Sequence, residues 1–221
     1  MDVIFKTSSK VVKASYPVLL LSAFSIGLLL VRVKLTQSMF FLFLIWNLFL
    51  AYLPYVFSLA IVHSKTIRQN NYYLYAALIA WLLVLPNAPY LITDFVHLYR
   101  DTAVPVWFDV LLLTSFTLSG LLIWLTSMRH IFKVLLHKFS AKSVHLLTAV
   151  ICLLCGFGLY LGRFLRYNSW DVLHRPTALF KDILLSLFTN ETYKIAWGIT
   201  IGFGILQYLL FILYNPEKSK E

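Results

Sequence analysis

The 221-residue sequence is 60% hydrophobic and 13% charged, and its mean hydropathy is +0.80. A soluble domain carries about 25% charged residues, so this composition excludes an ordinary water-soluble domain and predicts a protein that folds in a lipid bilayer. The net charge of +10 does not predict a nucleic-acid partner, because Lys and Arg stand in short clusters between apolar runs instead of forming one basic face.

Six apolar segments are predicted to cross the membrane, since a helix needs about 20 apolar residues to span the hydrocarbon core. The predicted spans are 17–31, 38–62, 72–85, 106–125, 144–165 and 195–214. Arg32 and Lys34 follow the first span and no small-residue cleavage site is evident, which favours an uncleaved anchor over a signal peptide. The predicted fold is an all-α, polytopic transmembrane helix bundle that forms a single integral membrane domain over 1–221.

The third span is predicted to be broken by two prolines in the stretch "LPNAPYLITDFVHLYRD". Pro86 and Pro89 end the first helix, and Asn87 is predicted to cap a second half-helix over 89–99. Four residues form a polar stripe along that half-helix: Tyr90, Asp94, His97 and Asp101. In a membrane, a broken helix with a polar face is tolerated where it lines a cavity or packs on protein. An amphipathic helix that rests at the interface is the alternative, and the pattern alone leaves both open.

A shorter apolar segment, 177–189, precedes the last span and contains Lys181 and Asp182, so we predict an interfacial amphipathic helix. Two pairs of glycines are spaced to let membrane helices pack closely, within the bundle or between copies in an oligomer. They are Gly158 with Gly162 and Gly198 with Gly202. Cys152 and Cys155 lie inside an apolar run and are interpreted as small core residues, not as a redox or metal motif.

The distribution of positive charge predicts a multi-pass cell-membrane protein with both termini in the cytoplasm. In that orientation the cytoplasmic segments contain 11 of the 19 Lys and Arg residues. The outer Lys and Arg residues gather mostly around the connection between the fifth and sixth spans. They are Arg163, Arg166, Arg175, Lys181 and Lys194. Because these charges oppose the orientation rule, we expect them to have another role.

Acidic residues give the strongest functional signal in the sequence. Of the nine, six lie in or beside the connections between the third and fourth and the fifth and sixth spans: Asp94, Asp101, Asp109, Asp171, Asp182 and Glu191. Both connections are predicted on the same, extracytoplasmic face. Carboxylates near a bilayer are costly and tend to mark functional sites. We therefore expect one polar site built from both connections. In that site Asp94 should lie within side-chain reach of Arg163 or Arg166, and Asp171 should lie near His97 or Asn87.

Two Asp-x-x-His pairs make a divalent metal ion a candidate cofactor. Asp94 with His97 and Asp171 with His174 would each share a helix face, and carboxylate with imidazole suits Zn, Mn or Fe. Asp94, His97 and Asp171 are also the candidate catalytic acids and bases. The alternative for each pair is a hydrogen bond between His and Asp.

The same stretches contain candidate ligands for an anionic group. Arg163 and Arg166 offer planar guanidinium donors that suit phosphate or carboxylate. Further candidate binding residues are Asn87, Tyr90, Asn168 and Trp170. The alternatives are that the arginines pair with nearby acids or reach toward lipid headgroups, and that Trp170 belongs to an interfacial aromatic belt.

Both stretches resemble the signatures of an uncharacterised prokaryotic membrane family, catalogued as domain of unknown function 1361. The matching segments are "LPNAPYLITDFVHL" and "GRFLRYNSWD", and His174 lies beyond them. The resemblance covers most of the chain and implies a polytopic membrane fold, with no established activity.

Three functions are compatible with these observations. The first is a membrane-embedded enzyme or ligand-binding protein that acts on an anionic or lipid-linked group, with or without a metal ion. The second is a transporter or channel that uses the broken helix. The third is a non-catalytic assembly or scaffold protein. We favour the first, and whether it catalyses a reaction stays open.

Overall fold

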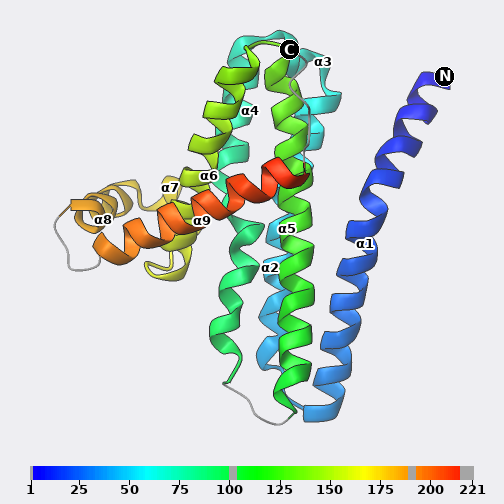
Figure 1. Ribbon diagram of the computed structural model, residues 1–221, viewed down its shortest axis with the longest axis vertical. Helices are drawn as coiled ribbons and strands as arrows, with labels where there is room; N and C mark the ends of the chain where they lie inside the picture. Colours follow the sequence, from blue (N-terminus) through cyan, green and yellow to red (C-terminus); the bar gives the residue numbers. More distant parts are fainter. Residues whose placement is uncertain (1, 100–103, 189–192, 215–221) are drawn as a thin grey trace.

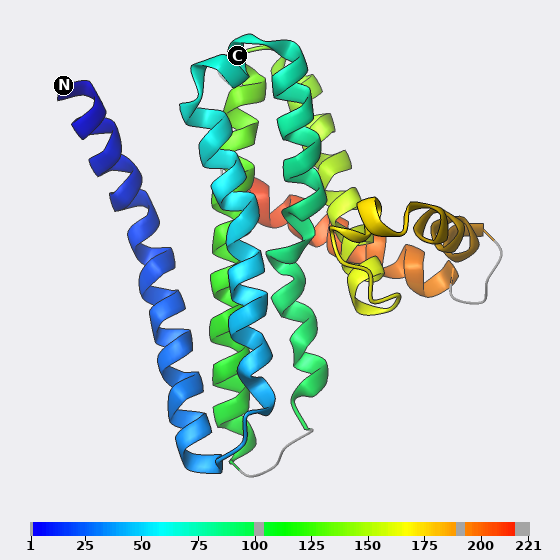
Figure 2. The ribbon, with the colours of Figure 1, turned by 180° about the vertical axis from the view of Figure 1, so that it is seen from behind.

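The computed structural model describes residues 2–99, 104–188 and 193–214, with side chains from residue 16 onward. All regular structure in these ranges is helical (Figures 1 and 2). The α-helices are α1 (Asp2–Thr36), α2 (Phe43–His63), α3 (Lys65–Gln69), α4 (Asn71–Val84), α5 (Val106–Leu136), α6 (Ala141–Arg163), α7 (Asp171–His174), α8 (Pro176–Phe188) and α9 (Tyr193–Tyr214). The 3₁₀ helices are η1 (Phe40–Leu42), η2 (Leu85–Asn87) and η3 (Pro89–His97).

Six helical segments are long and apolar enough to cross a membrane, which confirms the predicted polytopic all-α bundle. They are Tyr16–Thr36, Phe40–His63, Asn71–His97, Val106–Leu136, Ala141–Arg163 and Tyr193–Tyr214. α8 occupies the segment predicted as an interfacial helix. α5 runs 11 residues beyond the predicted end at 125, because no Gly or Pro stops it after the apolar run ends.

Most of the bundle consists of helices that run side by side (Figures 1 and 2). α1, α2, the third span and α5 extend along its length, and the α1–α2 connection and the start of α5 share one end. α3 and the α5–α6 connection lie at the opposite end. α6 starts there but ends part-way along the bundle, and α9 crosses obliquely beside it. The end of α6 therefore lies beside the middle of the third span.

α6 and α9 pack closely through Gly156 and Gly204, which belong to neither of the two predicted pairs, whereas Gly158 and Gly162 of the first pair contact the third span. A Cβ on Gly156 would lie 2.6 Å from the Thr200 carbonyl oxygen, and a Cβ on Gly204 would lie 3.0 Å from Leu153 Cα. A Cβ on Gly198 or Gly202 would meet no atom within 4 Å in the described part of the chain, so these two glycines make no close contact within the bundle, and packing between copies stays a prediction. The contact face follows the register of the two helices, which the spacing of glycines alone does not determine.

The predicted break in the third span is confirmed at Pro86. α4 ends at Val84, and the span continues through η2 and η3. A 3₁₀ helix of nine residues is long for this conformation. Asn87 does not cap the second part, which corrects the prediction: the cap position belongs to Ala88, whose backbone is itself helical and makes no side-chain capping bond. Asp101, the last member of the predicted stripe, lies outside the described residues.

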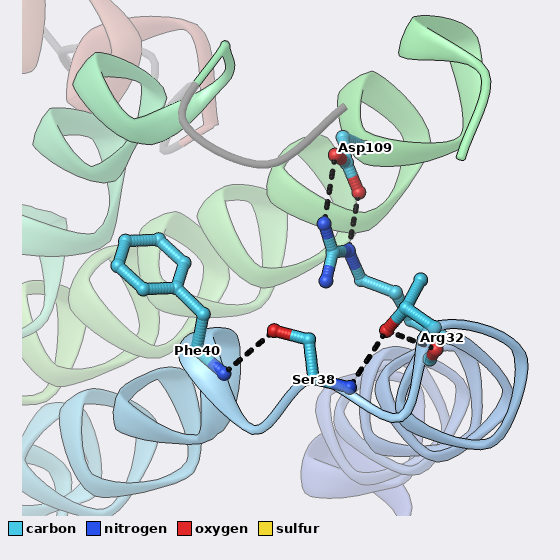
Figure 3. A network of polar contacts seen from close by, with 5 residues as sticks. Arg32, Ser38, Phe40 and Asp109 are labelled. Atoms are coloured by element: carbon cyan, nitrogen blue, oxygen red, sulfur yellow. Dashed lines mark hydrogen bonds and ion pairs between the residues drawn. The ribbon is translucent and has the colours of Figure 1, made fainter. Parts of the chain in front are cut away.

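A buried ion pair joins α1 to α5 near the end of the bundle that carries the α1–α2 connection (Figure 3). Arg32 is fully buried, and its Nε and Nη2 donate to the two carboxylate oxygens of Asp109 at 2.6 and 3.2 Å. The guanidinium also lies 4.2 Å from the centre of the Phe41 ring. The Thr36 and Ser38 hydroxyls accept backbone N–H bonds in the turn that follows. Arg32 is thus an internal charge and not the flanking charge that the sequence pattern indicated.

Candidate functional site

The two signature stretches meet where the third span changes from an α-helix to a 3₁₀ helix. Glycines on α6 make the approach possible: a Cβ on Gly158 would overlap Pro86, and one on Gly162 would lie 3.0 Å from the Tyr90 ring. Beyond α6, the side-chain amide of Asn87 donates to the Ser169 hydroxyl at 3.2 Å. The predicted convergence of the two stretches is confirmed by these contacts.

Arg163, the last residue of α6, joins the two stretches electrostatically. Its Nη1 lies 3.7 Å from Oδ1 of Asp94, which is 1% exposed. Asn47 of α2 donates to the other carboxylate oxygen at 2.9 Å. The predicted pairing of Asp94 with Arg163 or Arg166 is therefore confirmed for Arg163. Because a buried carboxylate needs a partner, this pair explains how Asp94 is tolerated inside a span.

His97 lies on the other side of the same guanidinium. Arg163 Nη2 and His97 Nε2 are 3.1 Å apart. A guanidinium carries only N–H donors, so Arg163 donates this bond and Nε2 accepts it. The phenyl rings of Phe40 and Phe43 lie edge-on to the imidazole at 5.7 and 5.1 Å between centres. These contacts fix the position of the His97 ring at the end of the third span.

A cavity of about 680 Å³ opens between α2, the third span, α6 and the segment after α6. Its polar lining comes from both signature stretches and from α2: Asn47, Asn87, Tyr90, His97, Arg163, Arg166, Asn168 and Ser169. Its apolar lining includes Leu50, Leu82, Leu83, Leu154, Phe157 and Leu161. Of the two alternatives for the broken helix, the structure therefore supports the one in which it lines a cavity.

Polar and apolar residues are mixed in the lining of this cavity, but several of them are ordered along the bundle axis. α2 starts at the bundle end that carries the α1–α2 connection, so Asn47 lies closer to that end than Leu50 does. The third span and α6 run toward that end, which places His97 and Arg163 beyond Leu82 and Leu154. His97 and Arg163 therefore lie toward one end of the bundle, and Leu82 and Leu154 toward its middle.

Asp171 supports the segment after α6 without lining the cavity. Its carboxylate accepts the backbone N–H of Asn168 at 2.7 Å and pairs with Arg175 at 3.4 Å, and the residue is 3% exposed. The predicted neighbours were His97 or Asn87, but Asp171 makes these bonds within its own segment. Local bonds to the backbone satisfy an aspartate at a helix start more readily than distant side chains do.

The four predicted metal ligands do not form one ligand set. Across 2–99, 104–188 and 193–214, no three His, Cys, Asp or Glu side chains are grouped closely enough to hold a metal ion. His174 is exposed, and its Nδ1 lies 3.1 Å from the Trp170 carbonyl oxygen. Asp94 and His97 are instead brought together by Arg163, whose positive charge disfavours a cation between them.

Two contacts at the site were not foreseen from the sequence. Asn47, which supports Asp94, is a lone polar residue inside an apolar span, and this was the signal that could have identified it. Tyr167 donates to the Asp182 carboxylate of α8 at 2.7 Å, and this hydrogen bond raises the pKa of the Tyr167 phenol. The bond ties the segment after α6 to α8.

Comparison with protein families gives a match over residues 46–210 to the family described as "Protein of unknown function (DUF1361)". The match begins inside α2 and ends inside α9, so it contains both signature stretches and leaves α1 outside. Comparisons with curated proteins and with solved structures find no match. The chain therefore belongs to the family described as Protein of unknown function (DUF1361), and it is a polytopic, membrane-type helical bundle.

Proposed function

We propose that this protein binds an amphiphile with an anionic head group, such as a lipid-linked phosphate, in the cavity between the broken third span and α6. The observation that carries the proposal is that one cavity of about 680 Å³ combines guanidinium and amide donors with an apolar wall. A volume of this size suits a small-molecule ligand.

The polar end offers donors suited to an anion. Arg163 has five N–H donors, which exceeds its contacts with Asp94 and His97, so it can also donate to a ligand. Asp94, which does not line the cavity, pairs with the Arg163 guanidinium and offsets the free-energy cost of burying its charge. We assign Asp94 a positioning role rather than a catalytic one. Asn87 and Asn168 add uncharged donors along the same wall.

The apolar end and the neighbouring helices suit a ligand that enters from the bilayer. With its head at Arg163, the tail of the amphiphile would lie along Leu82 and Leu154, toward the middle of the bundle. This is the orientation of a lipid in one leaflet. α8 exposes Phe180 and Phe188, at 64% and 71%, which suits a helix that rests in the interface near the cavity mouth. The positive-inside bias assigns this leaflet to the extracytoplasmic side.

Catalysis on the bound head group is a second candidate function, favoured by the position of His97. It is the one predicted catalytic residue that lines the cavity, and its Nε2 accepts a bond from Arg163. An anionic head group that draws the Arg163 donors to itself would release Nε2 to act as a base. Neither Asp94 nor Asp171 lines the cavity in the described ranges, so we give neither a direct role.

Lipid binding tests the proposal directly. Purified protein in detergent micelles is titrated with phosphatidic acid and with diacylglycerol of the same chains, and bound lipid is counted by native mass spectrometry. We expect saturable binding of phosphatidic acid only, and a loss of about tenfold or more in affinity for Arg163→Gln. Arg68→Gln, an exposed change at the opposite end of the bundle, is the matched control. Equal binding of both lipids, or an unchanged affinity in Arg163→Gln, would contradict the proposal.

A transporter that uses the broken helix is favoured by a different observation, namely that Pro86 and Asn87 at the break line the cavity. Flux of an anion across proteoliposomes, lost in Arg163→Gln, would support that function in place of lipid binding. Absence of both binding and flux would leave the scaffold function as the remaining alternative.

A further inference from the structure

Arg166 has a backbone conformation that an arginine rarely adopts. Its φ is +57°, in the left-handed region where the Cβ of an L-residue is crowded. In the described part of the chain, Gln37 at +54° is the other non-glycine residue with positive φ. Such a conformation costs free energy and persists where the surrounding structure imposes it, often at a functional site.

The conformation arises from the way α6 ends. The backbone N–H of Tyr167 donates to the Leu161 carbonyl at 3.1 Å, a bond across six residues. α6 ends at Arg163 with Phe164 as its C-cap residue, so Arg166 lies inside the turn that this bond closes. Glycine adopts a left-handed conformation at lower cost than any other residue. The presence of an arginine at this position therefore needs a separate explanation.

The side chain of Arg166 lines the cavity and contributes most of its net charge. Arg163 faces Asp94, and Arg175 pairs with Asp171. Asp182 accepts a bond from Tyr167 and does not line the cavity. Within the described ranges, no ion pair or side-chain hydrogen bond offsets Arg166, which lines the cavity and is exposed.

We propose that Arg166 is the binding residue by which this site selects a head group with two negative charges, a phosphomonoester, over a phosphodiester with one. The inference rests on the proposed function and deepens it. Asp94 largely neutralises the charge of Arg163. A head group with one negative charge is therefore bound mainly by hydrogen bonds from the polar residues of the cavity. A second negative charge on the phosphate would pair with the guanidinium of Arg166, whose planar donors suit phosphate oxygens.

Replacing Arg166 with glycine, the residue that this backbone conformation favours, distinguishes an effect on binding from an effect on folding. In Arg166→Gly we expect the unfolding temperature to equal or exceed that of the wild type, because glycine relieves the left-handed strain. The affinity for phosphatidic acid should fall about tenfold or more at pH 8, while that for phosphatidylglycerol of the same chains changes much less. Arg166→Lys keeps the charge and should retain part of the selectivity.

Gln37→Gly is the matched control, because it makes the same backbone change at a similar φ on an exposed residue after α1. It should leave both lipid affinities unchanged. Competition by inorganic phosphate that weakens in Arg166→Gly would also support the inference and show that the head group alone suffices.

Two results would overturn the inference while leaving the proposed function intact. One is Arg166→Gly protein that keeps the wild-type preference for phosphatidic acid over phosphatidylglycerol. The other is Arg166→Gly protein that unfolds at a lower temperature than both wild type and Gln37→Gly, since the arginine would then serve the fold. Wild-type protein that binds neither lipid would instead overturn the proposed function and, with it, this inference.

Discussion

Two arginine–aspartate pairs lie inside this protein, and they are built differently. Arg32 and Asp109 join α1 to α5 through two bonds of 2.6 and 3.2 Å, and the arginine side chain is 0% exposed. Arg163 and Asp94 join α6 to the third span at 3.7 Å, and the arginine side chain is 20% exposed. The first pair is closed, whereas the second opens onto a cavity.

The difference shows what each pair can do. A closed, bidentate pair satisfies both charges internally and leaves little for a ligand, so it serves to fix one helix against another. In the open pair, the aspartate is buried while the arginine keeps donors at the cavity wall. Similar residues thus give a structural contact in one region and a binding surface in the other.

The largest expected effect comes from breaking the closed pair. Asp109→Ala leaves the Arg32 guanidinium buried without its counter-charge, so we expect a loss of about 3–5 kcal/mol in the free energy of unfolding. Reversible unfolding of the protein in mixed micelles measures this loss. The double variant Arg32→Met/Asp109→Leu removes both charges and should recover most of the stability. Equal instability of the single and double variants would show that packing, not charge, holds α1 to α5.

Breaking the open pair should cost less. Asp94→Asn keeps the hydrogen-bonding shape beside Asn47, and the 20% exposed Arg163 side chain can be solvated from the cavity. We expect a loss of about 1–3 kcal/mol in the same unfolding measurement. A loss as large as that of Asp109→Ala would mean that the two pairs do not differ in the way proposed.

Hydropathy and helix-breaking residues predicted most of the fold, because a span is a local property of the sequence. The six spans, the break at Pro86 and α8 all follow from runs of apolar residues and from proline chemistry. The pairing of Asp94 with Arg163 followed from the cost of a buried charge, which leaves few possible partners.

Features that depend on helix register were not predictable. The sequence contains glycines on both faces of α6 and α9, and only packing shows that Gly156 and Gly204 make the contact. Asp171 was predicted near His97 or Asn87, both distant in the sequence, but it binds the local backbone N–H of Asn168. The Arg32–Asp109 pair joins residues 77 positions apart, with no motif to signal it.

A moderate effect is expected from the α6–α9 contact, which supports the helix that ends at the open pair. Gly156→Ala places a methyl group against the Thr200 carbonyl, and the rigid backbone there cannot move aside cheaply. We expect a loss of about 1–3 kcal/mol in unfolding free energy. Gly202→Ala is the control, since its Cβ would meet nothing within 4 Å. Similar losses in both variants would argue against this packing face.

The smallest effect on stability is expected from two cysteine substitutions that report the membrane side of the open pair. Met39→Cys lies at a residue that is 71% exposed in the α1–α2 connection, and Lys138→Cys lies at the opposite end of the bundle. An impermeant thiol reagent added to intact cells should label residue 39 and not residue 138, while the native cysteines are buried. Labelling of residue 138 alone would reverse the assigned orientation, and labelling of both would contradict the number of spans.

Photo-crosslinking with a lipid probe tests the central claim most directly, namely that the cavity beside the open pair holds an anionic amphiphile, head toward Arg163. The probe is phosphatidic acid with a diazirine on one acyl chain, and labelled residues are identified by peptide mass spectrometry. We predict that labelling concentrates on half-buried residues of the apolar wall, namely Leu50, Leu82, Phe157 and Leu161, and falls in Arg163→Gln. Labelling confined to outward-facing residues such as Leu19 and Leu118, at the same level in Arg163→Gln, would contradict the account.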